Sequence, residues 1–390
     1  MMNSISNFRT AHNIISGIGS IAQIEVETQK LKAQRAVIIT DKIILQTGLV
    51  DKVSAPLKNA GVHVDIIDEV VPEPPFENIE SIYEEIKKKA YDLFIGIGGG
   101  SALDVTKVLA VMPKNEGDIR EYVGIDQIPN PGVNTILIPT TSGTGSEVTF
   151  NAIFTDKRDN VKKGIVSPYL LPNIAIVDPM MTLTAPPSVT AATGLDALVH
   201  AIESYTAINA NELTDGIARH AVQLISKSLR QAVFNGNNIP AREDMSMGSL
   251  MAGISLANAG VGAVHALAYP LGGQFHIPHG VANALLLPYV MEYNKLSNLE
   301  KFAQIAEDMG ENIDGLSLRE AADRAVKAMS DLSKDIGIPS TLKDVGVKQE
   351  DLSLLAEEAS KVDRLLNNNP RKLKKEEIET IYQNAFAGVK

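Results

Sequence analysis

Short apolar runs alternate with longer amphipathic stretches through the first half of the chain. Four apolar runs predict strands, at residues 36–40, 62–67, 93–97 and 135–139. Stretches with helical spacing lie between them, at residues 49–60, 79–90 and 101–111. This alternation of strands and helices predicts a mostly parallel sheet covered by helices.

The pattern changes at Pro186 and Pro187. After these prolines the strand-like alternation gives way to long helical stretches, at residues 188–206, 212–234, 241–260, 299–309, 316–336 and 349–360. A chain of 390 residues is also longer than one core usually supports, because cores tend to split beyond about 250–300 residues. We therefore expect an α/β domain at residues 1–185 and an all-helical domain at residues 186–390.

Composition excludes several classes of protein. A hydrophobic fraction of 44% and a charged fraction of 21% are those of an ordinary globular chain. The net charge of −11 argues against nucleic-acid binding, which needs a clustered positive surface. No stretch reaches the roughly 18 unbroken apolar residues of a membrane span, and the N-terminal segment lacks the apolar core of a signal peptide. We expect a cytoplasmic protein without nucleic-acid or membrane partners.

A glycine-rich segment, LFIGIGGGSALDVTK at residues 93–107, joins a predicted strand to a predicted helix. Such a turn lets the backbone approach a phosphate, and the helix N-terminus supplies unpaired N–H groups. The spacing of Gly96, Gly98 and Ser101 departs from the full dinucleotide-binding pattern. An ordinary strand-to-helix turn that needs positive φ is an equally good interpretation of this segment.

Two further features agree with a nucleotide site. Asp41 follows the first predicted strand, where a carboxylate could accept hydrogen bonds from a ribose diol and would repel a 2′-phosphate, favouring NAD over NADP. Capping of the next helix explains Asp41 equally well. A polar turn at residues 139–147 (PTTSGTGSE) also follows a strand, and it fits either a phosphate-gripping wall or a capped loop.

The chain has no cysteine, so any transition-metal site must use His, Asp or Glu. Asp196 and His200 are four residues apart in a predicted helix and can point at one ion. With His265 and His279 they form a ligand set suited to Fe(II) or Zn(II). Each also has an ordinary interpretation, as a surface pair, a buried histidine or a helix cap, and spacing alone does not bring the four together.

Taken together, these segments resemble the iron-containing (group III) alcohol dehydrogenase family. The matching stretches are IGIGGGSALDVTK at 95–107, PTTSGTGSEVT at 139–149, TGLDALVHAIE at 193–203, VHALAYPLGGQFHIPHGVANALLLP at 264–288 and NNPR at 368–371. The resemblance implies a fold similar to dehydroquinate synthase, with an N-terminal Rossmann-like α/β domain, an all-α C-terminal domain and an active site in the cleft. It also implies an NAD(H)-dependent alcohol dehydrogenase or aldehyde reductase that works as a homodimer or larger assembly.

The resemblance assigns residues as well. The implied metal ligands are Asp196, His200, His265 and His279. The cofactor-binding positions, with Asp41 added from the strand pattern, are Asp41, Gly98, Gly99, Ser101, Asp104, Thr140, Thr141, Thr149, Asn151 and Lys162.

One position departs from the family's pattern. Many members carry a histidine four residues beyond the third ligand, near the nicotinamide, where it is often invoked in proton transfer. This chain has Tyr269 there, whose hydroxyl can donate a hydrogen bond but is no base at pH 7. His276 either replaces that proton carrier or forms a pocket wall. His279, His276 and Tyr269 are therefore the candidate catalytic side chains.

The implied reaction is hydride transfer between a small alcohol or diol and its aldehyde, with the metal polarising the substrate oxygen. The resemblance favours Fe(II), and the ligand set also accepts Zn(II). Three alternatives stay open: reduction of a charged aldehyde such as sulfoacetaldehyde, a non-redox lyase or polyol-phosphate dehydrogenase of the same fold, and a non-catalytic nucleotide or metal sensor. The matched stretches place few basic residues near the ligands, which disfavours a phosphate substrate, and the intact ligand set disfavours a sensor.

Overall fold

A computed structural model describes residues 5–158 and 161–388. The described chain forms two compact units, one of residues 9–185 and one that begins at Pro186 and includes residues 5–8. Within the described residues, no single helix has the length and apolar character needed to cross a membrane. Helices α8 (Ile239–Ala259) and α9 (Ala263–Phe275) meet those criteria only as a pair, which is bent by 103°.

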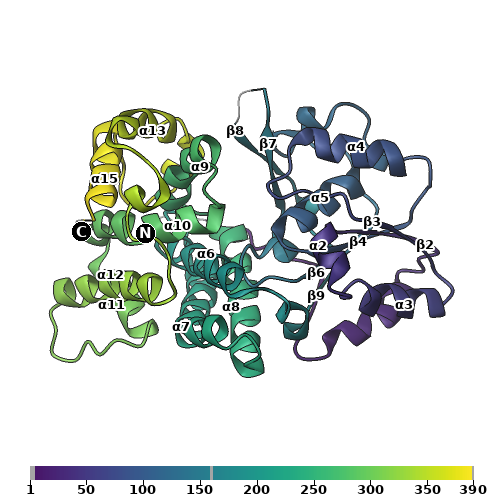
Figure 1. The fold of residues 1–390 in the computed structure, drawn as a ribbon, viewed down its shortest axis with the longest axis horizontal. Coiled ribbons are helices and arrows are strands. Elements are labelled where there is room, and N and C mark those ends of the chain that lie inside the picture. The colour runs from purple at the N-terminus through teal and green to yellow at the C-terminus, as the bar shows by residue number, and fades with distance from the viewer. Residues whose placement is uncertain (1–4, 159–160, 389–390) are drawn as a thin grey trace. The chain divides into compact units, whose positions relative to one another are not determined.

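Six parallel strands form the main sheet of the first unit, in the order β1-β9-β6-β4-β2-β3 (Figure 1). Their bounds are β1 Asn13–Ser16, β2 Arg35–Ile39, β3 His63–Ile67, β4 Leu93–Gly98, β6 Asn134–Pro139 and β9 Ile174–Val177. The four strands predicted from apolar runs are present, and the parallel α/β architecture is confirmed. The sequence pattern missed β1 and β9, because four residues each are too few for a run to stand out.

Helices cover both faces of this sheet (Figure 1). Successive side chains of a strand point to opposite faces, and β2 shows this directly: Val37 and Ile39 join one apolar cluster, while Ala36 and Ile38 join the other. The helices are α1 Ile24–Lys30, α2 Lys42–Gln46, α3 Asp51–Asn59, α4 Phe76–Ile86 and α5 Gly100–Val111. Burial on both faces explains why the strands are continuous apolar runs in the sequence.

A smaller sheet of three strands, in the order β5-β8-β7, packs onto the same unit. Its strands are β5 Gly124–Ile125, β7 Asn151–Asp156 and β8 Val161–Val166. The inner residues Ala152, Phe154 and Ile165 join the cluster that contains α4 and α5. The sequence pattern missed this sheet because few residues of β7 and β8 are fully buried, so neither strand is a continuous apolar run. The buried Asp156 at the end of β7 pairs with Arg158 and Lys163.

The order of strands creates a topological switch point between β2 and β4. The chain proceeds from β2 outward to β3 on one side, and from β4 outward to β6 on the other. Ligands of open α/β sheets bind at the carboxyl ends of the strands beside such a point. Asp41 and Gly98 follow or end these two strands, so the fold brings them to one edge of the sheet.

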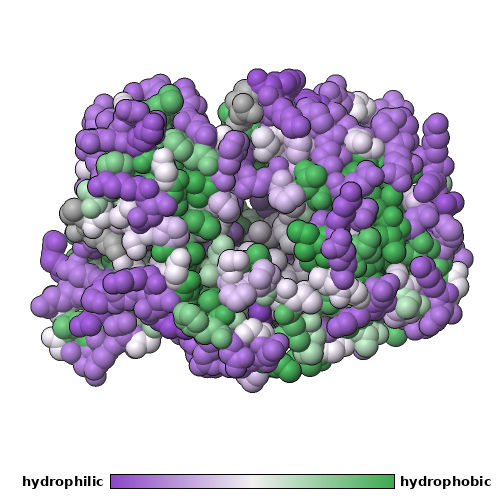
Figure 2. Space-filling view, in the orientation of Figure 1, coloured by the Kyte–Doolittle hydropathy of each residue, from purple (hydrophilic) through white to green (hydrophobic). Residues whose placement is uncertain are grey.

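The second unit is built from helices. They are α6 Pro187–Thr206, α7 Glu212–Phe234, α8 Ile239–Ala259, α9 Ala263–Phe275, α10 His279–Asn294, α11 Leu299–Asp308, α12 Leu318–Asp335, α13 Leu352–Ala359, α14 Asp363–Leu366 and α15 Lys375–Ala387. The outer helices α11 to α13 present mostly hydrophilic side chains on the face seen in Figure 2. The inner helices pack closely: a Cβ at Gly194 of α6 would lie 2.4 Å from Leu229 of α7. This close packing fixes α6, which carries two of the predicted ligands.

Candidate functional site

A buried cluster of acid and histidine side chains lies inside the helical unit. One ligand atom from each of Asp196, His265 and His279 lies within 4.8 Å of the others. His200 adjoins them, with its Nε2 3.9 Å from an Asp196 carboxylate oxygen and its ring stacked on His265 at a centroid distance of 4.9 Å. The four side chains come from three helices, α6, α9 and α10. The first and last of them, Asp196 and His279, are 83 residues apart in the sequence.

Asn283 lies at the centre of this cluster. Its amide nitrogen lies 2.7 Å from Asp196 Oδ1, 3.1 Å from His265 Nε2 and 3.1 Å from His279 Nε2. Three potential ligand atoms therefore surround one amide nitrogen, which has two hydrogens. The buried Oδ1 of Asn283 has no partner among the described residues. A divalent cation fits this donor set, because it is the group that converging imidazole and carboxylate lone pairs bind best.

Glu203 orients one of the histidines. Its Oε2 accepts a hydrogen bond of 2.5 Å from His265 Nδ1, and its Oε1 accepts one of 2.7 Å from the Val264 backbone N–H. With the proton on Nδ1, the Nε2 lone pair of His265 faces Asp196 and His279. Metal-binding histidines commonly have such a carboxylate partner, which fixes the tautomer. Neither Glu203 nor Asn283 was a predicted site residue. The sequence signal that could have found them is their spacing, since each lies one helical turn after a predicted ligand, His200 or His279.

The charge state of Asp196 reflects this environment. Burial opposes its ionisation, but the imidazoles of His200, His279 and His265 and the amide of Asn283 outweigh burial and lower the pKa of Asp196 to about 2. The carboxylate is therefore ionised at neutral pH and supplies a full negative charge to the cluster.

The other two candidate catalytic side chains differ in position. The ring of Tyr269 lies 6.0 Å from that of His279, and burial raises the pKa of its hydroxyl. Tyr269 is thus a protonated donor at the edge of the cluster. His276 is exposed and ends α9 in the left-handed conformation, with φ of 54°. A catalytic role for His276 stays a prediction from the sequence.

The first unit contains the predicted phosphate turn. Strand β4 ends at Gly98, and α5 begins at Gly100, one residue earlier than the sequence predicts. A Cβ at Gly98 would lie 2.7 Å from Ala102 Cβ, and φ is +156°, so this position requires glycine. Gly99 caps the helix without a side-chain bond, which leaves its first N–H groups directed to the carboxyl end of the sheet.

The structure shows the capping role of Asp41 that was considered from the sequence, and it places the second carboxylate oxygen at the glycine turn. Its Oδ1 accepts a 2.9 Å hydrogen bond from the Ile44 N–H and so caps α2. Its Oδ2 lies 3.7 Å from the ideal Cβ position of Gly98, on the glycine turn. Thr140, at the end of β6, is 1% exposed and its hydroxyl has no partner among the described residues. These groups are available for a nucleotide.

Other predicted cofactor positions form the frame of the turn. Asp104 accepts hydrogen bonds from the Ser146 hydroxyl and the Ile153 N–H, and it pairs with Lys107 at 2.9 Å. Lys107 Nζ in turn donates to Thr149 Oγ1 and to the Asn151 carbonyl. These contacts hold α5 in place beside the glycine turn, and the cofactor contacts of Asp104, Thr149 and Asn151 stay predictions.

Two remaining positions border the turn. Lys162 on β8 pairs with Glu73 at 3.1 Å. Glu73 itself has a positive φ of 48°, and its N–H donates to the Ser101 hydroxyl at 3.3 Å. Glu73 therefore links Lys162 to the start of α5. No sequence pattern marks this residue, because its positive φ is visible only in the structure.

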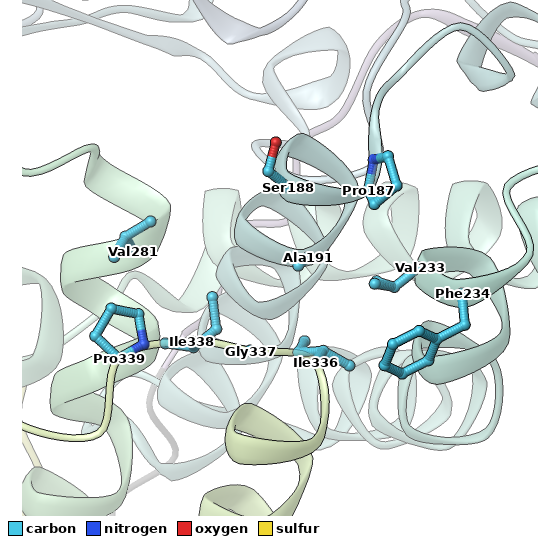
Figure 3. A pocket seen from close by; sticks show the side chains of 10 residues that line it. All are labelled: Pro187, Ser188, Ala191, Val233, Phe234, Val281, Ile336, Gly337, Ile338 and Pro339. Atoms are coloured by element: carbon cyan, nitrogen blue, oxygen red, sulfur yellow. The ribbon is translucent and has the colours of Figure 1, made fainter.

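A separate pocket of about 530 Å³ lies elsewhere in the helical unit (Figure 3). The starts of α6 and α10, the end of α7 and residues 336–339 line it, with Phe234 and Pro339 among the side chains drawn in Figure 3. Its lining contains no acid, histidine or lysine. The pocket therefore lacks the chemistry of the cluster and is not the catalytic site.

The fold and these two sites define a class of protein. A glycine turn at the switch point of a parallel sheet is typical of dinucleotide binding, and the buried carboxylate–imidazole cluster is typical of a catalytic metal centre. Comparison with protein families agrees: the model "Iron-containing alcohol dehydrogenase" matches residues 11–179, and "Fe-containing alcohol dehydrogenase family, C-terminal" matches residues 190–386.

Individual relatives support the same assignment over nearly the whole chain. Long-chain-alcohol dehydrogenase 1 of Geobacillus thermodenitrificans is 45% identical, over 95% of this chain and 94% of its own. The 1,3-propanediol dehydrogenase of Citrobacter freundii is 44% identical, over 95% and 96%. A crystal structure of 1,3-propanediol oxidoreductase superposes with a TM-score of 0.96 at 42% identity, covering 98% of this chain and all of that one. The chain belongs to the iron-containing alcohol dehydrogenase family, whose members include NAD-dependent alcohol dehydrogenases and aldehyde reductases.

Proposed function

We propose that this protein interconverts a small primary alcohol or diol and its aldehyde with NAD(H) and a divalent metal, most simply Fe(II). The observation that carries the proposal is the cluster in which one ligand atom from each of Asp196, His265 and His279 lies within 4.8 Å of the others. Converging carboxylate and imidazole atoms of this kind fit a bound divalent cation.

Asp196, His200, His265 and His279 would hold the ion, and Glu203 would keep His265 in the binding tautomer. When bound, the ion polarises the substrate oxygen and NAD(H) exchanges the hydride. The residues of this chain supply position and exclude water: Asp196 and His265 are at most 4% exposed. Tyr269, protonated beside His279, can donate a hydrogen bond to the substrate oxygen or to water, but it does not take up a proton at neutral pH.

The preference for NAD over NADP rests on Asp41. Its carboxylate lies at the glycine turn, where it would accept hydrogen bonds from a 2′,3′-diol and repel a 2′-phosphate. Gly98, Gly99, Ser101, Thr140 and Thr141 would line the phosphates, with Lys162 beside them.

The test is NADH oxidation with short aldehydes of two to six carbons by anaerobically purified enzyme, together with metal analysis. We expect activity that is lost on chelation and restored to apoenzyme by Fe(II), with Zn(II) as the competing ion. No turnover of any aldehyde by metal-loaded protein that still binds NADH would overturn the proposal in favour of a binding protein. Release of inorganic phosphate from a phosphorylated substrate would favour a lyase.

A further inference from the structure

The turn after helix α7 carries the one Asn-Gly pair of the sequence, Asn235 and Gly236. The helix ends at Phe234, and Asn235 is its C-cap, with φ of −136° and ψ of 78°, outside the helical region. Asn235 is exposed, and Phe234, drawn in Figure 3, is 73% exposed. The end of the helix is therefore open to water at this pair.

Two adjacent amides of the pair are not engaged by the protein. Among residues 5–158 and 161–388, neither the side-chain amide of Asn235 nor the backbone N–H of Gly236 has a hydrogen-bond partner. The other backbone groups of the turn are paired: the Asn235 N–H donates to the Gln231 carbonyl at 2.8 Å, and the Asn238 N–H donates to the Asn235 carbonyl at 2.9 Å. A reaction between the two unengaged amides therefore breaks no hydrogen bond within the described chain.

We propose that Asn235 is a site of spontaneous deamidation whose product loosens the anchoring of Arg242. The Gly236 backbone nitrogen loses its proton and attacks the side-chain Cγ of Asn235, so that a C–N bond forms and the side-chain nitrogen leaves as ammonia. Water then opens the resulting succinimide ring at either carbonyl, which gives aspartate or isoaspartate without any oxidant or reductant. Glycine favours the attack because it has no side chain to obstruct the nitrogen, and asparagine is a thermolabile residue in proteins generally.

Glycine at position 236 also has a structural reason, which links the turn to a buried arginine. A Cβ there would lie 3.1 Å from Arg242 Nη2, and the Gly236 carbonyl accepts a hydrogen bond of 2.9 Å from Arg242 Nε. Arg242, on α8, is 3% exposed, and its Nη1 donates to the Thr190 hydroxyl near the start of α6 at 2.9 Å. The turn, α8 and α6 are therefore joined through one buried guanidinium.

This link gives the modification a consequence for stability. Isoaspartate adds a methylene group to the main chain directly before Gly236, which shifts the Gly236 carbonyl relative to Arg242 Nε. A buried charged donor that loses an acceptor destabilises the folded state. We expect the isoaspartate form to unfold at a lower temperature than the unmodified protein, by roughly 2–5 °C in Tm.

The first test follows the tryptic peptide of residues 231–242 by mass spectrometry while the full-length protein is kept at mildly alkaline pH. The same peptide contains a matched control, Asn237, which is also exposed but is followed by Asn238 instead of glycine. Fragment ions locate the gain in mass of an acid over an amide, and enzymatic methylation measures isoaspartate. We expect Asn235 to convert at least about tenfold faster than Asn237, a difference in barrier of about 1.4 kcal/mol, and Gly236→Ala to slow the conversion by a similar factor.

The second test compares thermal unfolding of wild type and Asn235→Gln after the same period of ageing. Glutamine keeps an amide at the position but closes a ring on the backbone far more slowly. Wild type should lose Tm in proportion to its isoaspartate content, whereas the variant should keep its Tm. Asn235→Ser, which has no amide, should also keep its Tm and serves if the glutamine variant folds poorly.

Two results would overturn the inference. If Asn235 stays intact in the folded protein while a synthetic peptide of residues 231–242 converts, the fold protects the pair. If isoaspartate accumulates without any fall in Tm, the Gly236 carbonyl does not anchor Arg242. Neither result bears on the proposed function, because the pair shares no residue with the metal cluster or the glycine turn.

Discussion

The two units build their sites from different parts of the chain. The glycine turn between β4 and α5 would bind a nucleotide through backbone N–H groups of its glycines and of the helix N-terminus. A Cβ at Gly98 would lie 2.7 Å from Ala102. The metal cluster is made of side chains, with Asp196, His265 and His279 converging within 4.8 Å. A backbone site fails when a side chain is added, and a side-chain site fails when one is removed. Substitutions in each unit should therefore have separable effects.

The largest effect should come from His279→Ala, because it removes a ligand. We expect the variant to lose most of its bound metal and kcat to fall by about 1,000-fold or more. The reason is that a bound ion supplies several kcal/mol of transition-state stabilisation. NADH binding, measured by fluorescence, should change little because the nucleotide turn is in the other unit. His220→Ala, an exposed histidine of α7, is the control. Wild-type metal content and rate in His279→Ala would refute the assigned cluster.

Gly98→Ala is the converse experiment and should have the next largest effect. The added methyl must displace Ala102 or the turn itself, and alanine is strained at φ of +156°. We expect the dissociation constant for NADH to rise by roughly 100-fold, about 3 kcal/mol, while metal content stays at the wild-type level. Gly216→Ala is the control, because a Cβ there meets open space. A simultaneous loss of metal would show that the two sites are not separable.

The difference between a backbone site and a side-chain site also explains which parts of the structure could be predicted from the sequence. The strands of the main sheet were visible because burial on both faces makes each a continuous apolar run. The phosphate turn was visible for a related reason, since glycine is the residue that a tight backbone approach requires. The apolar strands and the glycine turn are both determined by residues that are neighbours in the sequence. Such local features can be predicted without knowing the fold.

The metal cluster is not local. Asp196 and His279 are separated by three whole helices, α7, α8 and α9. Spacing alone gave no reason for them to meet; only resemblance to a family did. Glu203 was missed because its role depends on a hydrogen bond of 2.5 Å from His265 Nδ1. No sequence pattern predicts this contact between two helices. His276 was included because it lies near His279 in sequence; the structure shows that it is exposed and ends α9 in the left-handed conformation.

Glu203→Gln sharpens the comparison within the metal site, because it leaves the ligands in place. Glutamine can still accept a hydrogen bond, but it lacks the charge that holds the proton on His265 Nδ1. We expect metal affinity to fall by about 10- to 100-fold, measured by competition with a chelator, and activity to recover at saturating metal. Glu212→Gln, on the exposed first turn of α7, is the control. Unchanged affinity would show that Glu203 supports packing rather than the ligand.

The smallest effect should come from Glu147, a buried carboxyl in the unit that otherwise relies on backbone. Burial raises its pKa to about 7, against the opposing effects of a backbone hydrogen bond and Lys107. In the unfolded chain the carboxyl has its ordinary pKa of 4.5 and ionises above it. Between these values the folded state keeps a proton that the unfolded state has lost, so the free energy of unfolding falls as pH rises from about 4.5 to 7, by up to about 3 kcal/mol.

Glu147→Gln replaces the titrating acid with a neutral group of the same size and should remove this contribution. Relative to wild type, the variant should gain stability as pH rises from 5 to 8, by a few degrees in apparent Tm, because wild type must then bury a charge. Comparing the two proteins at each pH cancels the titration of all other groups. A difference in Tm that is constant from pH 5 to pH 8 would mean that Glu147 is ionised throughout and fully compensated by Lys107. The α/β unit would then contain a buried charged side chain, as the helical unit does at Asp196. The glycine turn would be the remaining difference between the two sites.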